Sequence, residues 1–402
     1  MPEAVIVATA RTPIGRAFKG SLVDMRPDDL TVLIVRALLE KVPELDPHSV
    51  EDLMVGCGSP AGEAGFNLAR VVAVLAGLDD VPGTTVNRYC SSSLQTIRMA
   101  AHAIRAGEGD VFISAGVETV SRFASGASDS GAARNPLFAE AIERTKERSE
   151  KVTDPWTPPQ GLPDIYIAMG QTAENVAEFE KVSRHEMDEF ALRSQELAVA
   201  HQENGFFERE ITPVTLADGT VVAKDDGPRA GTTLEKLASL QPVFRQGGTV
   251  TAGNACPLND GAAGVIVMSD TRAKELGIKP LARVVASGVS GLNPEIMGLG
   301  PIEACRQALR RANMTIDDID LVEINEAFAA QVLPSAKHLG IKLDKLNIRG
   351  GAIALGHPFG MTGARIMTTL LNSLEDSSKR FGLESMCVGG GQGMAMIVER
   401  LN

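Results

Sequence analysis

The stretch VNRYCSSSLQTIRMAAHAI, residues 86–104, joins the expected end of a buried strand to the start of an amphipathic helix. Cys90 stands at this junction, and three serines follow it. Unpaired N–H groups and the dipole at a helix N-terminus favour negative charge, so this position makes a thiol easier to ionise. A small buried core residue is the alternative interpretation of a lone cysteine. The rest of the chain has to decide between the two.

Expected strands and helices alternate on both sides of this junction. Buried apolar runs predict strands at 4–10, 49–57, 83–90 and 110–118. Apolar residues at helical spacing predict helices at 28–42, 67–78 and 92–107, the last of them ended by Gly107. This alternation is typical of the α/β class, in which helical crossovers join parallel strands.

The same order of segments returns roughly 270–280 positions later in the chain. The later copies are ARVVASGV at 282–289, a helical pattern at 301–314, a strand pattern at 316–328, a strand-to-helix junction at 347–371 and a final strand pattern at 384–399. Five matches in the same order argue against a chance resemblance between two α/β segments. The sequence therefore predicts two similar α/β halves that pack against each other.

The alternation of strands and helices is interrupted between the two halves, at about 121–249. Residues 134–151 predict a charged helix, 151–164 a Pro-rich loop, and 216–233 turns with short strands. A further helix is predicted from Ser183 to Gly205, because Ser183 and Glu186 form a capping box. We expect an insertion that covers a functional site. The predicted organisation is 1–120, the first part of the N-terminal half; 121–249, an inserted loop domain; 250–275, the return to that half; and 276–402, the C-terminal half.

The net charge and the cysteine content of the chain limit the classes of function that it can have. The net charge of −12 argues against a general nucleic-acid or membrane-surface role, although a phosphorylated small ligand needs only a local basic patch. The cysteines Cys57, Cys90, Cys256, Cys305 and Cys387 form no C-x-x-C pair and no zinc spacing, so we expect no metal site. Their odd number, the absence of an expected targeting segment and the lack of a long apolar run predict a cytoplasmic protein.

The second half supplies two further candidates for chemistry. In GGAIALGHPFGMTGARI, residues 350–366, His357 stands at the junction that corresponds to Cys90. A histidine there can polarise a thiol or donate to a developing oxyanion, and a helix-capping role is the alternative. Cys387 precedes three glycines, whose N–H groups can converge on an anion. A pseudo-twofold between the halves would bring all three side chains toward one point.

The chain resembles the thiolases, the acetyl-CoA acyltransferases and acetyltransferases, over essentially its whole length. The motifs that carry the resemblance are the opening MPEAVIVATARTPI, NRYCSSSLQ (87–95), GTVTAGNACPLNDGAA (248–263), INEAFAAQ (324–331), GGAIALGHPFGMTGARI (350–366) and CVGGGQGMAM (387–396). The resemblance implies two similar five-stranded mixed-sheet α/β halves related by a pseudo-twofold, with an inserted loop domain. It also implies a homodimer or homotetramer.

The resemblance implies a role for five residues. Cys90 matches the nucleophile that becomes acylated, and His357 matches the histidine that activates it. Cys387 matches the second cysteine, which moves the α-proton of an acetyl group. Asn325 would hold a water in one oxyanion hole with His357, and the backbone N–H groups of Cys90 and Gly389 would form the other. Loss of one such donor typically costs about 10²–10³ in rate.

The resemblance further implies coenzyme A and acyl-CoA as substrates, with no permanently bound cofactor. The family binds coenzyme A mainly through the inserted loop domain. The nucleotide end would meet Arg229 and Lys236, for which ordinary solvated surface charge is an equally open interpretation. The other candidate contacts are Phe244, Ala252 and Ala255 for the pantetheine channel, Met169 and Met297 for the acyl pocket, and Cys256 and Phe328.

Three positions depart from the family pattern. Ser93 replaces a glycine after the nucleophile, Cys256 replaces a serine, and Ala168 replaces the histidine of short-chain biosynthetic members. The last change favours a degradative enzyme, which cleaves 3-ketoacyl-CoA with CoA to acetyl-CoA and a shortened acyl-CoA. A biosynthetic acetoacetyl-CoA-forming thiolase and a non-catalytic acyl-CoA binding protein are the alternatives. Ketoacyl and hydroxymethylglutaryl-CoA synthases normally lack the second cysteine of C-x-G-G-G.

Overall fold

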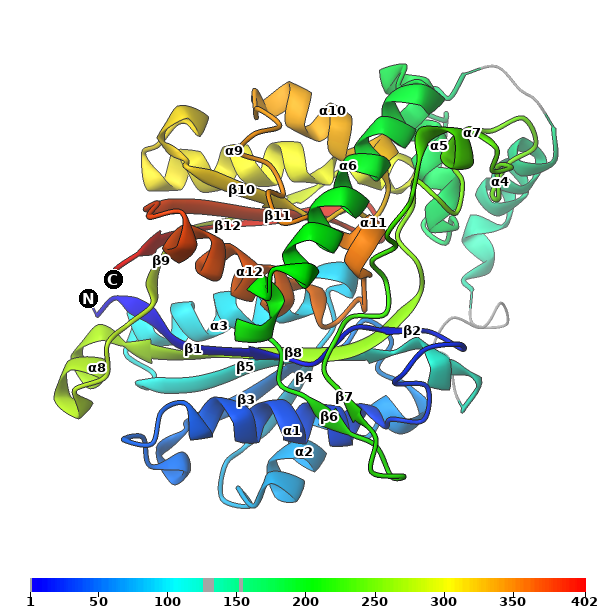
Figure 1. Ribbon diagram of the computed structural model, residues 1–402. Helices are drawn as coiled ribbons and strands as arrows, with labels where there is room; N and C mark the ends of the chain where they lie inside the picture. Colours follow the sequence, from blue (N-terminus) through cyan, green and yellow to red (C-terminus); the bar gives the residue numbers. More distant parts are fainter. Residues whose placement is uncertain (1, 126–133, 152–154) are drawn as a thin grey trace.

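The computed structural model describes residues 2–125, 134–151 and 155–402. Its core has five layers, in which two sheets of strands alternate with three layers of helices (Figure 1). Helices α9 (Gly300–Ala312) and α10 (Ala329–Leu339) cover the outside of one sheet, and α1 (Pro27–Glu40) and α2 (Leu68–Ala76) cover the outside of the other. The predicted α/β class is confirmed.

The first sheet belongs to the N-terminal part of the chain. Its strands are β1 (Ala4–Arg11), β3 (Asp52–Gly56), β4 (Gly83–Val86), β5 (Val111–Thr119) and β8 (Asn259–Ser269). Their order is β1-β8-β5-β3-β4, with β3 parallel to β4 and β5, and β8 antiparallel to β5 and β1. The short strand β2 (Gly15–Arg16) pairs with β8, and α8 (Asp270–Leu276) follows it. β1, β5 and β8 are buried along their whole length because helices cover both faces.

The second sheet repeats this order. Its strands are β9 (Ala282–Gly291), β10 (Leu321–Ile324), β11 (Phe381–Val388) and β12 (Gln392–Arg400), arranged β9-β12-β11-β10. The place that β4 has in the first sheet is taken here by one isolated bridge between Val322 and Leu346. β1 and β9 pair at two positions, which joins both sheets into one hydrogen-bonded path of nine strands among the described residues, with β2 paired to β8 beside that path.

Two helices from matching places in the halves form the middle layer. These are α3 (Ser92–Ala106) and α12 (Thr362–Asp376), and they lie against each other between the sheets (Figure 1). Their first turns touch, because a Cβ on Gly363 would lie 2.3 Å from the backbone nitrogen of Leu94. Ser93 Oγ accepts a 2.9 Å hydrogen bond from the N–H of Ala364. The serine that replaces the family glycine therefore connects the two halves.

The predicted strand at 83–90 is shorter than expected. β4 ends at Val86, and a single 3₁₀ turn, Tyr89–Ser91, precedes α3. Tyr89 has a φ of +42°, in the left-handed region that a residue with a side chain rarely adopts. The chain therefore turns sharply at Cys90, where an extended strand was predicted.

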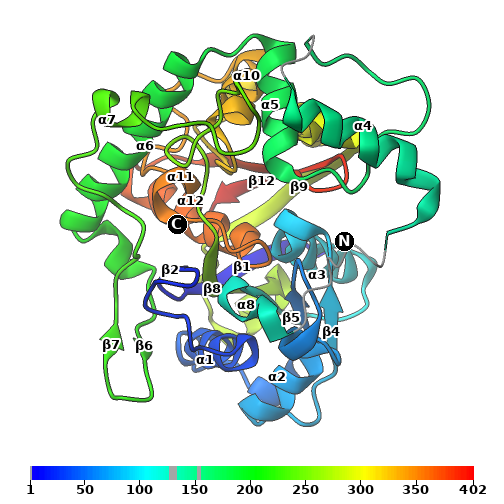
Figure 2. The ribbon, with the colours of Figure 1, turned by 90° about the vertical axis from the view of Figure 1, so that its right-hand side faces the viewer.

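Between β5 and β8 the chain leaves the sheet. The described helices of this segment are α4 (Ala139–Glu150), α5 (Met169–Glu180), α6 (Arg184–Glu203) and α7 (Leu234–Ala238), and β6 (Val214–Thr215) pairs with β7 (Val221–Val222). The helices lie beside the second sheet, and the hairpin extends down to α1 (Figure 2). The predicted capping box of Ser183 and Glu186 is confirmed, whereas α5 was not among the predicted helices. The predicted loop at 151–164 includes 152–154, which lie outside the described residues.

Within the described part of the chain, no helix combines the length and the apolar character that a membrane crossing requires. α6, which spans 20 residues, illustrates this, because charged and polar residues occur along its whole length. Its buried side packs on α11 (Ala352–Leu355), the short helix that precedes His357.

A group of buried ionisable side chains lies between α12 and the second sheet. Arg365 comes from α12, and Glu323 and Glu384 are register partners on β10 and β11. Both carboxylate oxygens of Glu384, and Nε and Nη1 of Arg365, have no hydrogen-bond partner among the described residues. Burial raises the pKa of Glu384 well above its usual range, against the opposing charge of Arg365, and raises that of Glu323 to about 8. Such groups keep a proton in the folded state that the unfolded chain releases.

We predict that Glu384→Gln stabilises the protein increasingly as pH rises. Below the unfolded pKa both states bind the proton, so the variant and the parent should melt alike. Above it, only the parent keeps a proton in the folded state that its unfolded chain releases, which costs the parent up to about 1.4 kcal/mol per pH unit as the pH rises toward the raised pKa of Glu384. Melting temperatures by circular dichroism across this range measure the difference. The control is Glu44→Gln at an exposed site, and parallel curves for all three proteins would contradict the prediction.

Candidate active site

Cys90 lies in the sharp turn that begins α3 and faces a cavity of about 800 Å³. Its side chain is buried, with 8% exposed. The turn is held locally, because Ser92 Oγ accepts from the N–H of Arg88 (2.9 Å) and donates to the carbonyl of Tyr89 (2.7 Å). Strained backbone of this kind is typical of functional positions. The thiol therefore sits at the start of a helix, as the sequence predicts.

His357 lines the same cavity, from the loop between α11 and α12. Its backbone N–H donates to Asn259 Oδ1 (3.0 Å), and its Nδ1 lies 2.6 Å from Thr362 Oγ1. Thr362 uses its one hydroxyl proton on the carbonyl of Pro358 (2.8 Å), so it accepts from Nδ1–H. This assignment leaves Nε2 as an acceptor, and Asn325 Nδ2 lies 3.2 Å from it.

Burial keeps both reactive groups neutral. It raises the pKa of the Cys90 thiol to about 11, although the N–H groups of Gly389 and Cys90 oppose the shift. The expectation that the helix start makes this thiol easier to ionise is therefore wrong for the resting protein, because burial outweighs the backbone donors. Burial, with the charge of Arg365, lowers the pKa of His357 to about 3. At pH 7 the resting pair is a thiol and a neutral imidazole. The imidazole can thus accept the thiol proton only as negative charge is passed on to a bound reactant.

Cys387 and Gly389 lie behind Cys90, on β11 and in the turn that follows it. The N–H of Gly389 lies close enough to the sulfur of Cys90 to oppose the rise in its pKa. Cys387 is fully buried, and repulsion from Cys90 and Cys256 adds to burial in raising its pKa well above the usual range. A Cβ on Gly389 would meet the ring of Tyr89 at 3.4 Å. The structure therefore brings three thiols and a backbone donor together.

Asn325 reaches this group from the turn after β10. Its backbone N–H donates to the carbonyl of Ser385 (2.9 Å), and its own carbonyl accepts from Gln331 Nε2 (2.7 Å). While Nδ2 faces His357, Oδ1 is buried without a hydrogen-bond partner in the described part of the chain. A buried acceptor of this kind needs a donor from a water or a ligand.

Most of the other candidate residues line the same cavity as Cys90 and His357. Cys387, Asn325 and Gly389 do not line it but lie next to residues that do. The predicted contacts that line it together with Cys90 and His357 are Met169, Arg229, Lys236, Phe244, Ala252, Ala255, Cys256, Met297 and Phe328.

Arg16 is a cavity residue that sequence reasoning missed. It lines the cavity with Arg229 and Lys236, and all three cations are exposed, which places them at the open end. Partial burial of the guanidinium and repulsion from Arg16 lower the pKa of Arg229. Lys236 Nζ donates to the carbonyl of Gly231 (2.7 Å), whereas neither guanidinium has an ion-pair partner among the described residues. An anionic ligand bound at this open end of the cavity would relieve the repulsion between the two guanidinium groups and would accept hydrogen bonds from them.

The three departures from the family pattern have structural outcomes. Ser93 is buried and bonded to α12, as described above. Cys256 is part of the cavity wall, where burial and repulsion from Cys90 raise its pKa and keep it a neutral thiol. Ala168 is the N-cap of α5 and lines the cavity, so its small side chain leaves space there.

Glu118 is a second residue that sequence reasoning missed. Its buried carboxylate accepts from the N–H groups of Gly58 (2.8 Å) and Ser59 (3.0 Å), in the loop after β3. It also accepts from the N–H of Gly360 (2.8 Å), in the loop that carries His357. Burial raises its pKa to about 7 against these three donors. An acidic residue at the end of an apolar strand was the only signal in the sequence.

We predict that alkylation of Cys90 by iodoacetamide accelerates about tenfold per pH unit between pH 7 and pH 10. The reason is that the thiolate fraction grows with pH until the raised pKa is reached. Peptide mass spectrometry separates the Cys90 adduct from adducts at Cys256. Cys90→Ser is the control for assignment. A rate that is already constant at pH 7 would show a preformed thiolate and contradict the prediction.

Comparisons with known proteins agree with this geometry. The family models described as thiolase, N-terminal domain, and thiolase, C-terminal domain, match residues 4–271 and 278–400. A β-ketoadipyl-CoA thiolase of Acinetobacter baylyi is 44% identical over 410 residues, which is 100% of both chains. A 3-ketoacyl-CoA thiolase of Bacillus subtilis is 40% identical, over 99% of this chain and 100% of the relative.

The structural comparison extends over the same length. The crystal structure of the Bacillus anthracis acetyl-CoA acetyltransferase matches with a TM-score of 0.87 and 39% identity, and it covers 100% of this chain and 99% of that one. The resemblance stated from the motifs is therefore confirmed, and with it the acyltransferase class. The chain belongs to the thiolase family.

Proposed function

We propose that the protein is a degradative thiolase, which cleaves 3-ketoacyl-CoA with CoA to acetyl-CoA and a shortened acyl-CoA. One observation carries the proposal: Cys90 and His357 line the same cavity, and Cys387 and the N–H of Gly389 lie close to the Cys90 sulfur. Acyl transfer to and from carbon requires a nucleophile, a base, an acid and a donor to the oxyanion. Cys90, His357, Cys387 and the N–H of Gly389 would take these roles in that order.

Coenzyme A would enter with its nucleotide at the exposed end of the cavity. Arg16, Arg229 and Lys236 supply positive charge there. Pantetheine would then run past Phe244, Ala252 and Ala255 toward the buried thiol. We propose that CoA and acyl-CoA are substrates and that no cofactor is held permanently. The segment 121–249 acts in this proposal as the CoA-binding cover between the parts 1–120 and 250–275, and 276–402 is the second half.

In the first step, the Cys90 sulfur attacks the 3-keto carbon while His357 Nε2 accepts its proton. The bond between C2 and C3 then breaks, which leaves the acyl group on Cys90 and the electron pair on the acetyl-CoA carbanion. Cys387 protonates that carbanion. The N–H groups of Cys90 and Gly389 form one oxyanion hole, and His357 with a water on the unpartnered Oδ1 of Asn325 forms the other. CoA finally attacks the thioester on Cys90: the CoA sulfur takes the acyl group, its thiol proton passes to the Cys387 thiolate, and His357 returns its proton to the released Cys90 sulfur.

The degradative direction rests on the acyl end of the cavity. Ala168, Met169 and Met297 line it together with Phe328. The small Ala168 in place of a histidine leaves room for chains longer than acetoacetyl. The relative of 44% identity is named for β-ketoadipyl-CoA, whose acyl group is longer than acetoacetyl, which supports this direction.

We predict that incubation with 3-ketoacyl-CoA adds the mass of the shortened acyl group to Cys90. Cys90→Ser should lose the adduct and at least about 10³ of turnover, because serine is a weaker nucleophile under this base. Cys387→Ala should lose a similar factor of turnover while leaving the alkylation of Cys90 intact. Cys305→Ser, a buried cysteine outside the cavity, is the matched control and should change turnover less than about threefold. Binding without an adduct would indicate an acyl-CoA binding protein.

A homodimer or homotetramer is part of the proposal, and an open sheet edge supports it. β4 is the last strand of its sheet and is only half-buried. Beside it, Asn67 Nδ2 donates to the carbonyl of Gly83 (2.8 Å), and the ring of Phe66 is 98% exposed. An apolar side chain next to an unpaired strand edge suits pairing with a second copy. We also propose a cytoplasmic location, which the five free thiols support.

We predict that Phe66→Glu weakens the association of subunits at least tenfold, because it places a charge in a contact that buries an aromatic ring. Sedimentation velocity over a range of protein concentrations measures the monomer fraction. Phe18→Glu is the control, since Phe18 is also exposed (60%) but lies on the loop beside β2. If Phe66→Glu left the association constant of the subunits unchanged, the interface would have to lie on another part of the surface.

A further inference from the structure

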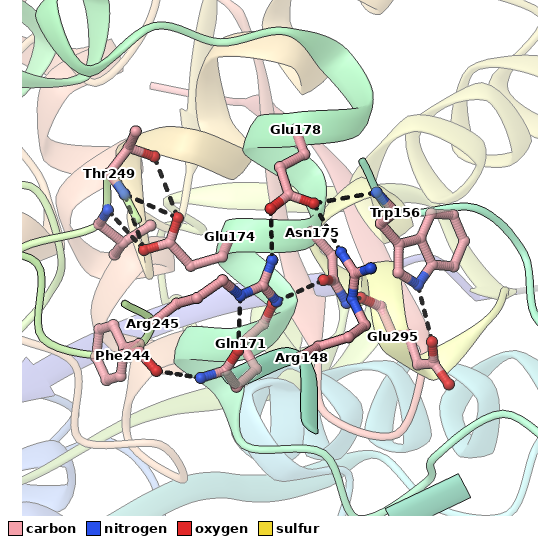
Figure 3. Close-up of polar contacts among 11 residues, drawn as sticks. Arg148, Trp156, Gln171, Glu174, Asn175, Glu178, Phe244, Arg245, Thr249 and Glu295 are labelled. Atoms are coloured by element: carbon pink, nitrogen blue, oxygen red, sulfur yellow. Dashed lines mark hydrogen bonds and ion pairs between the residues drawn. The ribbon is translucent and has the colours of Figure 1, made fainter. Parts of the chain in front are cut away.

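One face of helix α5 is polar although it is turned into the protein. Gln171, Glu174, Asn175 and Glu178 follow the i, i+3, i+4, i+7 spacing of a single helix face, and the first three are buried. Buried polar side chains destabilise a fold unless they are hydrogen-bonded. Figure 3 shows that Gln171, Asn175 and Glu178 point toward Arg245. Glu174 points toward the backbone of Thr249.

Arg245 is the centre of these contacts. Its side chain is 4% exposed and forms a 2.6 Å ion pair with Glu178 Oε1. Its Nη2 donates to Asn175 Oδ1 (2.7 Å), and its Nε donates to Gln171 Oε1 (3.0 Å). Gln171 Nε2 in turn donates to the backbone carbonyl of Phe244. The guanidinium therefore fixes the orientation of the amide that holds Phe244.

The far end of the same segment is held by Glu174. Its carboxylate accepts from the N–H of Thr249 (3.0 and 2.9 Å) and from the N–H of Val250 (2.9 Å). The approach is close, since a Cβ on Gly248 would lie 2.3 Å from Glu174 Oε1. The segment 244–250 is thus attached to α5 at both ends.

A second arm of the network reaches the turn that contains Met297. Asn175 Nδ2 donates to the carbonyl of Glu295 (2.9 Å), and the carboxylate of Glu295 accepts from Trp156 Nε1 (2.8 Å). Glu178 Oε2 accepts from the N–H of Trp156 (3.0 Å) and pairs with Arg148 (2.8 Å; Figure 3). Arg245 and Glu178 therefore stand where three segments meet.

The other side of these three segments is the wall of the cavity. Met169 at the start of α5, Phe244 and Met297 all line it, whereas Arg245 does not. Phe244 packs directly on α5, because a Cβ on Gly170 would lie 2.1 Å from its ring. The ring also meets Phe328 edge-on, with centroids 6.0 Å apart. A shift of the segment 244–250 away from α5 would move the Phe244 ring and change the width of the channel.

We propose that Arg245 is a positioning residue for substrate binding: without touching the substrate, it sets the place of Phe244 in the channel through Gln171 and Glu178. This inference rests on the proposed function, since it takes the channel to be the path of coenzyme A. A purely structural anchor is the rival role. It would lower thermal stability without a specific effect on affinity.

The test compares Arg245→Gln and Arg245→Lys with the parent enzyme. Arg245→Gln should raise the KM for 3-ketoacyl-CoA about tenfold or more and change kcat less than about threefold. Arg245→Lys keeps the positive charge opposite Glu178 but loses the guanidinium hydrogen bonds to Gln171 and Asn175. Its KM should therefore lie between that of the parent enzyme and that of Arg245→Gln. The matched control is Arg283→Gln, which removes an ion pair with Glu399 outside the cavity and should leave KM unchanged.

A double-mutant cycle with Phe244→Ala separates positioning from general destabilisation. If Arg245 acts through Phe244, Arg245→Gln should add less than twofold to KM once the ring is absent. Additive effects, or a lower melting temperature with unchanged KM, would overturn the proposal. Calorimetric titration with CoA alone supplies a readout that does not need turnover. A parent enzyme that binds CoA without turnover would refute the proposed function, and the Kd values of the variants would still decide the role of Arg245.

Discussion

The contact between the first turns of α3 and α12 is the constraint on which the site depends. Gly363 leaves room for the backbone of Leu94, and Ser93 accepts the N–H of Ala364. Because both helices begin at this contact, the loops that precede them end at the same place. One loop contributes Cys90, and the other contributes His357. A side chain at position 363 would separate the helices and, with them, the two reactive groups.

The same packing sets the electrostatics of the site. Helices and sheets exclude water from Cys90, Cys387 and His357, and burial favours the neutral form of each. Charge then forms only when a bound reactant can receive it, and the backbone donor at Gly389 is already in place. Donors that need no rearrangement stabilise developing charge strongly in a low-dielectric site. A neutral resting state is therefore compatible with a reactive thiol.

Buried charged side chains do two different things in this protein. Glu118 holds the N–H groups of two loops, and Arg245 holds helix α5 to the segment that contains Phe244. In both cases a buried polar side chain satisfies backbone or amide groups that would otherwise destabilise irregular chain. Glu384 and Arg365 lack such partners among the described residues, so there burial costs stability. The difference is one of hydrogen bonding, since all four side chains are buried.

The sequence by itself determined the α/β class, the repeated order of segments and the motif residues at the two helix starts. These depend on local patterns, because apolar spacing and capping groups act within a few residues. Only the tertiary structure decided that β4 ends at Val86 and that the second sheet has a single bridge at its fifth position. It also decided that Arg16 lines the cavity, that Glu118 bonds the loop that carries His357, and that Arg245 bonds helix α5. Their roles depend on contacts such as that of Glu118 with Gly360, which are 242 positions apart in the chain. No spacing rule extends over such a distance, because packing sets it.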